Sequence, residues 1–258
     1  MVPGIPTAVT PAGWHAGSMF DETAELYDLA YAHKDYAAEA AWVVDAVRSR
    51  APRARTLLDV ACGTGAHLAH LRDEFACEGL DLLDEFVQIA TARSGVPIHH
   101  GDMGDFDLGR TFDAVVCLFS SIGYVDDLDA AIGAMARHVA GDGMLVVEPW
   151  FTPDEWIPGH IHVLDHERDG TRLIRMSHSG VDGDVAVLSM HYLIGDGQGV
   201  EHRLEDHRLK LFTDAAYRAA FASAGLDVEL DRPGPFGRGA YIGSRTTSTG
   251  SLSNRSPR

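Results

Sequence analysis

The sequence predicts a doubly wound α/β fold, in which a mostly parallel seven-stranded sheet carries an inserted antiparallel β meander. Two observations support this prediction. Between residues 21 and 148, short apolar runs alternate with helical patterns, as is typical of parallel strands covered by helices on both faces. Between residues 160 and 212, four strand-like runs follow one another with little helix between them. A chain of 258 residues accommodates one large domain with such an insertion.

The first part of the chain is expected to alternate between helices and strands. Apolar residues at helical spacing predict helices at 21–31, 35–50, 66–75, 84–92 and 128–139. Short apolar runs predict strands at 56–60, 78–82, 97–100, 112–118 and 144–148. The last of these strands is expected to follow a Gly-Asp-Gly turn at 141–143.

The second part begins with the meander, whose strands are expected at 160–168, 171–179, 184–195 and 200–212, with hairpin turn residues between them. A helix at 214–224 and strands at 226–231 and 239–243 then complete the sheet. We therefore expect a disordered leader (1–18), a cofactor-binding core with an N-terminal helical lid (19–159), the insertion (160–212), the end of the core (213–243) and a disordered tail (244–258).

Composition excludes several classes of function. A formal charge of −17 argues against nucleic-acid binding, which requires a basic surface. No run of 18 apolar residues predicts a membrane helix, and no secretory signal is recognisable. The three cysteines match neither a disulfide framework nor a zinc site, so we expect a cytoplasmic protein. The 14 histidines do not occur at metal-binding spacing, so no metal is expected.

The loop after the first strand predicts the cofactor. It reads Asp59-Val-Ala-Cys-Gly-Thr-Gly65, and glycines between a strand and a helix let the backbone approach a ligand. Dinucleotide enzymes use Gly-x-Gly-x-x-Gly to hold a pyrophosphate, but the third glycine is missing here. S-adenosylmethionine has no phosphate, and its ammonium and sulfonium groups suit the acidic residue ahead of the glycines. We therefore expect S-adenosylmethionine as cofactor.

Later strands are followed by residues that fit the rest of this cofactor. Asp81, at the end of the second strand, is placed to accept hydrogen bonds from both ribose hydroxyls. Asp102 suits the adenine amino group, and Met103 is placed to pack on the ring. The expected cofactor contacts in the loops after the strands are Asp59, Ala61, Gly63, Gly65, Asp81, Leu82, Asp102, Met103 and Phe119.

With these stretches in order, the chain resembles the class I methyltransferases, and more narrowly the nucleotide-sugar N,N-dimethyltransferases of antibiotic biosynthesis. The resemblance spans residues 20–243. Its motifs include Lys34-Asp-Tyr36, Phe119-Ser-Ser-Ile-Gly-Tyr124, Val146-Val-Glu-Pro-Trp150, Ser177-His-Ser179 and Gly234-Pro-Phe-Gly-Arg-Gly239. The chain departs from the family pattern in having Tyr124 where some relatives have a histidine, and Asp81 in place of a glutamate.

The resemblance implies an activity and a set of residue roles. The family dimethylates the amine of a dTDP-linked deoxyamino sugar with methyl groups from S-adenosylmethionine. It implies that Tyr27, Lys34 and Tyr36 belong to the helical lid over the cofactor, and that Tyr124 and Glu148 lie on the sugar-nucleotide side. As polar groups on that side, Tyr124 and Glu148 are our catalytic candidates. The residues expected to bind the sugar nucleotide are Phe20, Trp150, Arg175, Ser177, His178 and Arg238.

Two other functions remain open at this level. One is a class I methyltransferase acting on another small amine or a hydroxyl, which would give Arg238 no phosphate to bind. The other is a cofactor-binding protein without catalytic activity. The meander is expected to wall the substrate site and to mediate a homodimer, because edge strands tend to be covered.

Overall fold

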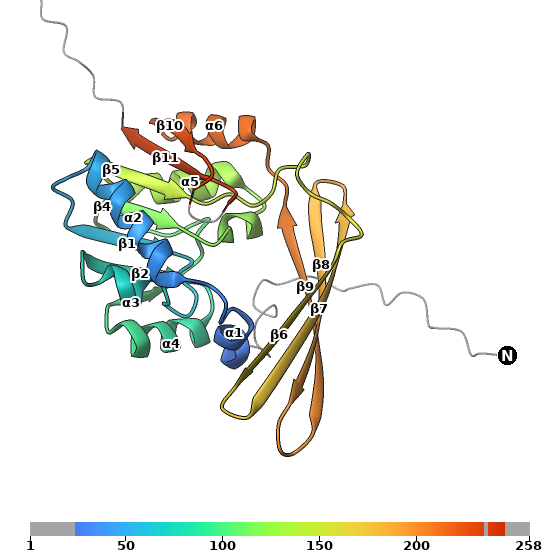
Figure 1. The fold of residues 1–258 in the computed structure, drawn as a ribbon. Helices are drawn as coiled ribbons and strands as arrows, with labels where there is room; N and C mark the ends of the chain where they lie inside the picture. Colours follow the sequence, from blue (N-terminus) through green and yellow to red (C-terminus); the bar gives the residue numbers. More distant parts are fainter. Residues whose placement is uncertain (1–23, 235–236, 246–258) are drawn as a thin grey trace, which may run out of the picture.

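The computed structural model describes residues 24–234 and 237–245, and its centre is a seven-stranded sheet in the order β10-β11-β5-β4-β1-β2-β3 (Figure 1). Strands β1 to β5 are parallel to one another, whereas β11 is antiparallel to both of its neighbours, β5 and β10. The strands are β1 (Thr56–Val60), β2 (Ala76–Asp81), β3 (Ile98–His100), β4 (Phe112–Cys117), β5 (Val139–Val147), β10 (Leu226–Asp231) and β11 (Ala240–Arg245). This sheet confirms the predicted fold class.

Helices cover both faces of the sheet because the strands are apolar on both sides. Leu57 packs with one set of helices and the adjacent Leu58 with the other. The first set is α2 (Tyr36–Arg50), α3 (Leu68–Leu71) and α4 (Asp84–Ser94), and the second is α5 (Leu128–Arg137) and α6 (Asp214–Ser223). Asp35, Asp127 and Thr213 begin α2, α5 and α6 by accepting a hydrogen bond from a first-turn amide.

The inserted meander forms a separate four-stranded antiparallel sheet beside the carboxyl ends of the main strands (Figure 1). Its strands are β6 (Ile161–Arg168), β7 (Thr171–Asp182), β8 (Val185–Gly195) and β9 (Val200–Lys210). Leu173, Met190 and Tyr192 on its inner face pack against Leu29 and Ala30 of α1 (Ala24–Ala30). The insertion and the lid helix are therefore joined by an apolar cluster of their own.

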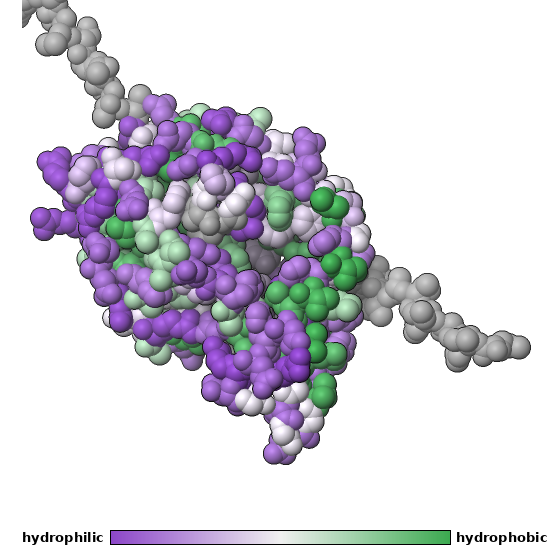
Figure 2. Space-filling view, in the orientation of Figure 1, coloured by the Kyte–Doolittle hydropathy of each residue, from purple (hydrophilic) through white to green (hydrophobic). Residues whose placement is uncertain are grey.

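The outer face of this sheet carries several exposed apolar side chains among polar ones. Strand pairing sets Val163 opposite Met176 on this face, and Leu204 follows on β9. These three side chains are 50–52% exposed. Figure 2 shows apolar side chains gathered along this side of the molecule. None of the helices in the described ranges is long and apolar enough to cross a membrane.

The structure corrects several predicted boundaries. The helix expected at 66–75 is only the four-residue α3, because the chain leaves it through turns before β2 begins at Ala76. The Gly-Asp-Gly turn at 141–143 lies within β5 instead of preceding it, and a β-carbon on Gly143 would lie 2.8 Å from the Asp113 carbonyl. β11 continues to Arg245, so two residues of the predicted tail belong to the sheet. The predicted leader, Phe20 and the rest of the tail lie outside the described residues.

Candidate active site

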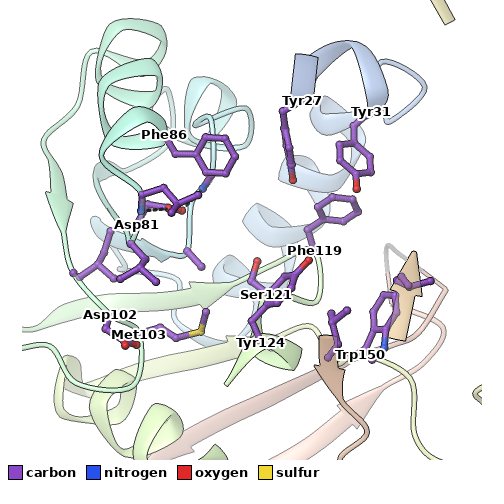
Figure 3. A pocket seen from close by; sticks show the side chains of 18 of the residues that line it. Tyr27, Tyr31, Asp81, Phe86, Asp102, Met103, Phe119, Ser121, Tyr124 and Trp150 are labelled. Atoms are coloured by element: carbon purple, nitrogen blue, oxygen red, sulfur yellow. Dashed lines mark hydrogen bonds between the residues drawn. The ribbon is translucent and has the colours of Figure 1, made fainter. Parts of the chain in front are cut away.

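A cavity lies where the parallel strands end, between the main sheet and the inserted sheet (Figure 3). The loops after β1, β2, β3 and β4 contribute Gly63, Leu82, Met103 and Phe119 to its lining. A smaller cavity adjoins it and shares Tyr27, Gly63 and Phe119 with it. Together, the two cavities are lined by most of the loops in which the sequence predicts cofactor contacts.

The loop after β1 uses its two glycines differently. Both have positive φ, +55° at Gly63 and +74° at Gly65, which disfavours side chains. A β-carbon added at Gly63 would meet no atom within 4 Å, whereas one added at Gly65 would lie 3.0 Å from the Cα of Ala90 in α4. Gly63 and Ala61 line both cavities, but Gly65 lines neither. Gly63 therefore leaves room for a ligand, and Gly65 lets the loop pack against α4.

The smaller cavity contains two buried polar groups that lack partners. Asp59 is 1% exposed, and its Oδ2 has no hydrogen-bond partner among the described residues. The same holds for the hydroxyl of Tyr36. Burial, and then the neighbouring Asp81, raise the pKa of Asp59 to about 8. Because buried polar groups are almost always paired, an acceptor and a donor left open in one cavity fit the ammonium and carboxylate of an amino acid.

Asp81 connects the glycine loop to the start of α4. Its two oxygens accept hydrogen bonds from the Gly63 amide at 2.7 Å and the Leu83 amide at 3.1 Å. Burial raises the pKa of this carboxyl, and the two amide hydrogen bonds oppose that rise. Leu82 lines the larger cavity beside Asp81, as do Asp102 and Met103. The predicted ribose and adenine contacts thus lie around one cavity.

Aromatic rings from α1 and from the turn that follows it cover this cavity. Tyr27 packs against Phe86 with ring centroids 5.3 Å apart, and Tyr31 meets the edge of Phe119 at 5.0 Å (Figure 3). Lys34 is not among the cavity-lining residues; its Nζ lies 3.8 Å from the centre of the Phe119 ring and 2.8 Å from Glu39 Oε1. The lid is thereby held over Phe119 by an edge-to-face aromatic contact and by a cation–π contact.

A polar cluster that the sequence analysis missed ties the lid to the core. The Arg93 guanidinium forms an ion pair with Asp28 of α1 and donates to the Thr64 hydroxyl at 2.7 Å. The Thr64 hydroxyl in turn donates to Asp28 at 2.9 Å. Three segments distant in the sequence meet here, and no local motif identifies such a contact.

The predicted catalytic carboxylate Glu148 is fully buried and does not line either described cavity. It accepts a hydrogen bond from the Phe119 amide at 2.5 Å and forms an ion pair with Arg238. Phe119 and Ser120 have φ of +54° and +60°, a strained conformation for residues with side chains. Glu148 therefore fixes the turn after β4, and a direct contact with the substrate amine remains a prediction.

Arg238, Trp150 and Tyr124 do reach the larger cavity. Arg238 donates from Nε to the Ser120 hydroxyl at 2.9 Å and from Nη2 to Glu148, and no partner for its Nη1 is found in the described ranges. The indole nitrogen of Trp150 is buried and, within the same ranges, unpaired. Tyr124, from the 3₁₀ helix η2 (Ser121–Tyr124), donates or accepts a hydrogen bond with His207 at 2.9 Å.

The remaining substrate candidates on β7 do not line either described cavity. Arg175 is 7% exposed and donates to the Tyr31 hydroxyl at 3.2 Å, beside the lid. Ser177 is buried on the same inner face, whereas His178 is exposed on the outer face. The strand alternation that buries Ser177 necessarily turns His178 away from the cavity.

The structure adds cavity residues that were not predicted from the sequence. They are mainly apolar and come from the lid, α4, η2 and the inserted sheet: Tyr31, Phe86, Ser121, Leu188, Met190 and Leu209. Alternation along β8 and β9 predicts an apolar face, but no motif in the sequence indicates what that face contacts. No group of three or more His, Cys, Asp and Glu side chains within residues 24–234 and 237–245 could hold a metal ion.

Known proteins are similar in sequence to this chain over most of its length. Residues 57–143 match the methyltransferase domain family. The chain is 47% identical over 230 residues to the dTDP-3-amino-3,6-dideoxy-alpha-D-glucopyranose N,N-dimethyltransferase of Streptomyces fradiae, covering 86% of this chain and 90% of that relative. The chain belongs to the dTDP-amino sugar N,N-dimethyltransferases. A Saccharopolyspora spinosa relative, dTDP-4-amino-2,3,4,6-tetradeoxy-D-glucose N,N-dimethyltransferase, is 43% identical over 232 residues, which cover 86% of this chain and 92% of the relative.

Solved structures agree with this membership. Streptomyces venezuelae DesVI superposes with a TM-score of 0.83 at 44% identity, covering 86% of this chain and 98% of DesVI. CalS10 from Micromonospora echinaspora, an amino pentose methyltransferase solved with S-adenosylmethionine bound, has a TM-score of 0.80 at 38% identity and covers 86% and 97% of the two chains. This dimethyltransferase is therefore an S-adenosylmethionine-dependent enzyme, which confirms the predicted cofactor and reaction class.

Proposed function

We propose that this dimethyltransferase transfers methyl groups from S-adenosylmethionine to the amine of a dTDP-linked deoxyamino sugar, giving the N,N-dimethylamino sugar. The relatives from S. fradiae and S. spinosa bear names for that reaction on 3-amino and 4-amino sugars. The observation that carries the proposal is the continuity of the larger cavity. One lining runs from Asp81 and Met103, where the cofactor is expected, to Trp150 and Arg238.

The residues around the cavity suit an in-line displacement controlled by position. When bound, the cofactor supplies a methyl group on an electrophilic sulfonium. The rings of Tyr27, Tyr31 and Phe119 would exclude water, and Asp59 would hold the ammonium end of the methyl donor. Holding nitrogen, methyl carbon and sulfur in line can supply roughly 7–11 kcal/mol of the barrier reduction.

Arg238 suits the diphosphate of the sugar nucleotide. It is the sole Arg or Lys among the described residues that line the larger cavity, in a chain with a net charge of −17. An anionic substrate therefore meets positive charge at that point, and guanidinium favours bidentate contact with phosphate. Trp150, next to Arg238 in the lining, offers an aromatic face for thymine or the sugar.

A mass assay tests the proposal. The enzyme, S-adenosylmethionine and either a dTDP-amino sugar or the same free amino sugar are incubated, and added methyl groups are counted. We expect two methyl groups on the nucleotide-linked sugar and little reaction with the free sugar. Equal reaction with both would contradict the nucleotide-sugar assignment and favour another small amine as substrate. Absence of methyl transfer to every amine, with the cofactor bound, would favour a non-catalytic protein.

Arg238 variants refine this assay. Arg238→Lys keeps the positive charge beside buried Glu148 but loses bidentate geometry, so we expect KM for the dTDP-amino sugar to rise about 10-fold with unchanged cofactor affinity. Arg218→Lys is the matched control, because Arg218 pairs with Asp214 on the surface of α6. An unchanged KM in Arg238→Lys would remove Arg238 from diphosphate binding.

We propose further that the outer face of the inserted sheet forms a homodimer. Five apolar side chains on this face are 45–52% exposed: Ile161, Val163, Met176, Leu193 and Leu204. Exposed apolar side chains gathered on one face are typical of interaction sites, and a second copy of the chain would match this face across a two-fold axis. Light scattering should give twice the chain mass, and Met176→Lys should give the mass of one chain. A monomeric wild-type chain at micromolar concentration would contradict the dimer.

A cytoplasmic location and a substrate-wall role for residues 160–212 belong to the same proposal. Cys62, Cys77 and Cys117 are free and buried, as suits a reducing compartment. Leu188 and Met190 of the insertion line the larger cavity, which supports the wall. Enzyme recovered with the cytoplasmic fraction of its host would agree with this location, and recovery outside the cell would contradict it.

A further inference from the structure

The inserted sheet contributes only apolar side chains to the described lining of the larger cavity. These side chains, which we call the apolar wall, are Leu188, Met190 and Leu209. The polar lining residues come from the lid and the core, and Figure 3 shows two of them, Ser121 and Tyr124, between Met103 and Trp150. Because the cavity lies between the two sheets, a molecule bound in it meets polar groups on one side and the apolar wall on the other.

The apolar wall is not simply a consequence of an apolar strand face. On the inner face of the sheet, Met190 lies opposite Glu205 and Leu188 lies opposite His207. Neither Glu205 nor His207 lines a described cavity. The two side chains lie 3.3 Å apart, and His207 is bonded to Tyr124 at 2.9 Å. The polar groups of this face are therefore engaged with protein atoms, and its apolar groups face the cavity.

The apolar wall spans the distance between the two ends of the proposed site. At one end, Met190 packs in a cluster with Leu29 of the lid helix. At the other end, Leu209 lies beside Trp150, since a β-carbon added to Gly123 would lie 3.0 Å from Leu209 Cδ2 and 3.1 Å from Trp150 Cβ. The sugar ring, which joins the amine to the diphosphate, is the part of the substrate that this span accommodates.

We propose that the apolar wall binds the C6 methyl group of the sugar, so that the inserted sheet selects 6-deoxy sugars. This inference rests on the proposed function, because it places the diphosphate at Arg238 and the amine beside the methyl donor. The C6 methyl is the largest apolar group that a deoxyamino hexose carries. On the wall it is removed from water, whereas a C6 hydroxyl there would give up its hydrogen bonds to water and gain none from leucine and methionine side chains.

The direction and the size of this selectivity both follow from the chemistry of the wall. Apolar side chains reject a ligand that carries an added hydroxyl by only about 10- to 100-fold. A site built to hydrogen-bond that hydroxyl would have the opposite preference, because its own polar group would be left unpaired by the deoxy sugar. The sign of the preference therefore distinguishes an apolar subsite for C6 from a polar one.

Substrate pairs that differ only at C6 test the proposal in the full-length enzyme. Each dTDP-3-amino and dTDP-4-amino sugar is supplied with hydrogen or with a hydroxyl on C6, and we expect kcat/KM of the wild type to be about 10- to 100-fold higher for the 6-deoxy sugar. Met190→Gln brings a donor and an acceptor to the wall and should reduce this preference about 10-fold. Met190→Leu, which stays apolar, should keep it.

A matched control places the same amide elsewhere on the inserted sheet. Val200 begins β9, is 75% exposed and does not line the cavity, so Val200→Gln should leave the preference unchanged. Unchanged affinity for S-adenosylhomocysteine in calorimetry shows that each variant keeps its folded cofactor site. A Val200→Gln effect as large as that of Met190→Gln would overturn the assignment to the wall.

A second measurement does not depend on a variant or on turnover. With S-adenosylhomocysteine and a 6-deoxy substrate bound, we expect a nuclear Overhauser effect between the sugar C6 methyl and the Met190 Cε methyl, and its absence would overturn the proposal. Equal kcat/KM for the two sugars of a pair, or a preference for the hydroxylated one, would overturn this inference and leave the proposed function intact. Absence of methyl transfer to all four sugars would overturn the proposed function and this inference with it.

Discussion

Replacing Asp59 with Asn should stabilise the cofactor-free enzyme while weakening its hold on the cofactor. Asp59 is 1% exposed, and its Oδ2 has no hydrogen-bond partner among the described residues. Burial, with Asp81 adding to it, raises the pKa of the carboxyl to about 8 from an ordinary 3.8. The Asp59 carboxyl therefore destabilises the folded protein when no cofactor is bound, and it contributes to cofactor binding when a cation lies beside it.

The size and sign of this effect follow from linkage between protonation and folding. In the unfolded chain Asp59 ionises near pH 4, whereas in the folded chain it holds its proton to about pH 8. Stability contributed by such a group is complete below pH 4 and is lost as pH rises toward 8. At about 1.4 kcal/mol for each pKa unit, the loss at pH 7 is at most about 4 kcal/mol. Asn does not titrate but keeps an unpaired amide, so we expect a net gain of about 1–3 kcal/mol.

Urea denaturation of wild type and Asp59→Asn between pH 5 and pH 8, without cofactor, measures this directly. The free energy of unfolding of the variant should exceed that of wild type by an amount that grows with pH. Calorimetry should show S-adenosylmethionine binding about 10- to 100-fold weaker in the variant, because a charge-assisted hydrogen bond is lost. Asp73→Asn, at an exposed carboxylate, is the control. A variant less stable than wild type, or a difference independent of pH, would refute the reasoning.

Three further outcomes follow from contacts around the site. Gly65→Ala should lower the free energy of unfolding by about 1–3 kcal/mol, because φ at Gly65 is +74° and the new methyl would lie 3.0 Å from Ala90 Cα. Gly133→Ala is the control, because a β-carbon at Gly133 in α5 meets no atom within 4 Å, and it should leave this free energy unchanged. Glu148→Gln should lower the free energy of unfolding, measured in urea titrations, by about 1–3 kcal/mol, since the ion pair with Arg238 is lost. Arg93→Met should weaken S-adenosylmethionine binding in calorimetry, because the lid loses its tie to the glycine loop.

The parallel half of the fold follows closely from the sequence. β1 begins and ends at the predicted residues, Thr56 and Val60, because a buried strand between helices is a continuous apolar run. The predicted helix at 66–75 is shorter, since its last residues turn toward β2. In the sequence, Gly143 is typical of a turn, but it lies within β5. A glycine is needed there because a carbonyl oxygen of β4 approaches too closely for a side chain.

The site is predictable where each residue follows a strand. The carboxyl ends of parallel strands lie at the same edge of the sheet, so Asp81, Met103 and Phe119, which follow three of these strands, are predicted to lie near one another. Residues that act through distant partners could not be found this way. The pairing of Glu148 with Arg238 joins positions 90 residues apart, and β9 hides Glu205 and His207 behind an exposed Leu204. Leu209 lies on the same inner face, so apolar alternation along β9 does not reveal that these two polar side chains are buried.

A crystal structure with S-adenosylhomocysteine and an unmethylated dTDP-amino sugar tests the central claim, that one cavity brings methyl donor and sugar amine together. We expect the homocysteine amine on Asp59, the diphosphate on Arg238, and the sugar nitrogen within hydrogen-bond distance of the Tyr124 hydroxyl. A sugar nucleotide bound outside this cavity, or a sugar nitrogen separated from the sulfur by a protein side chain, would contradict the account.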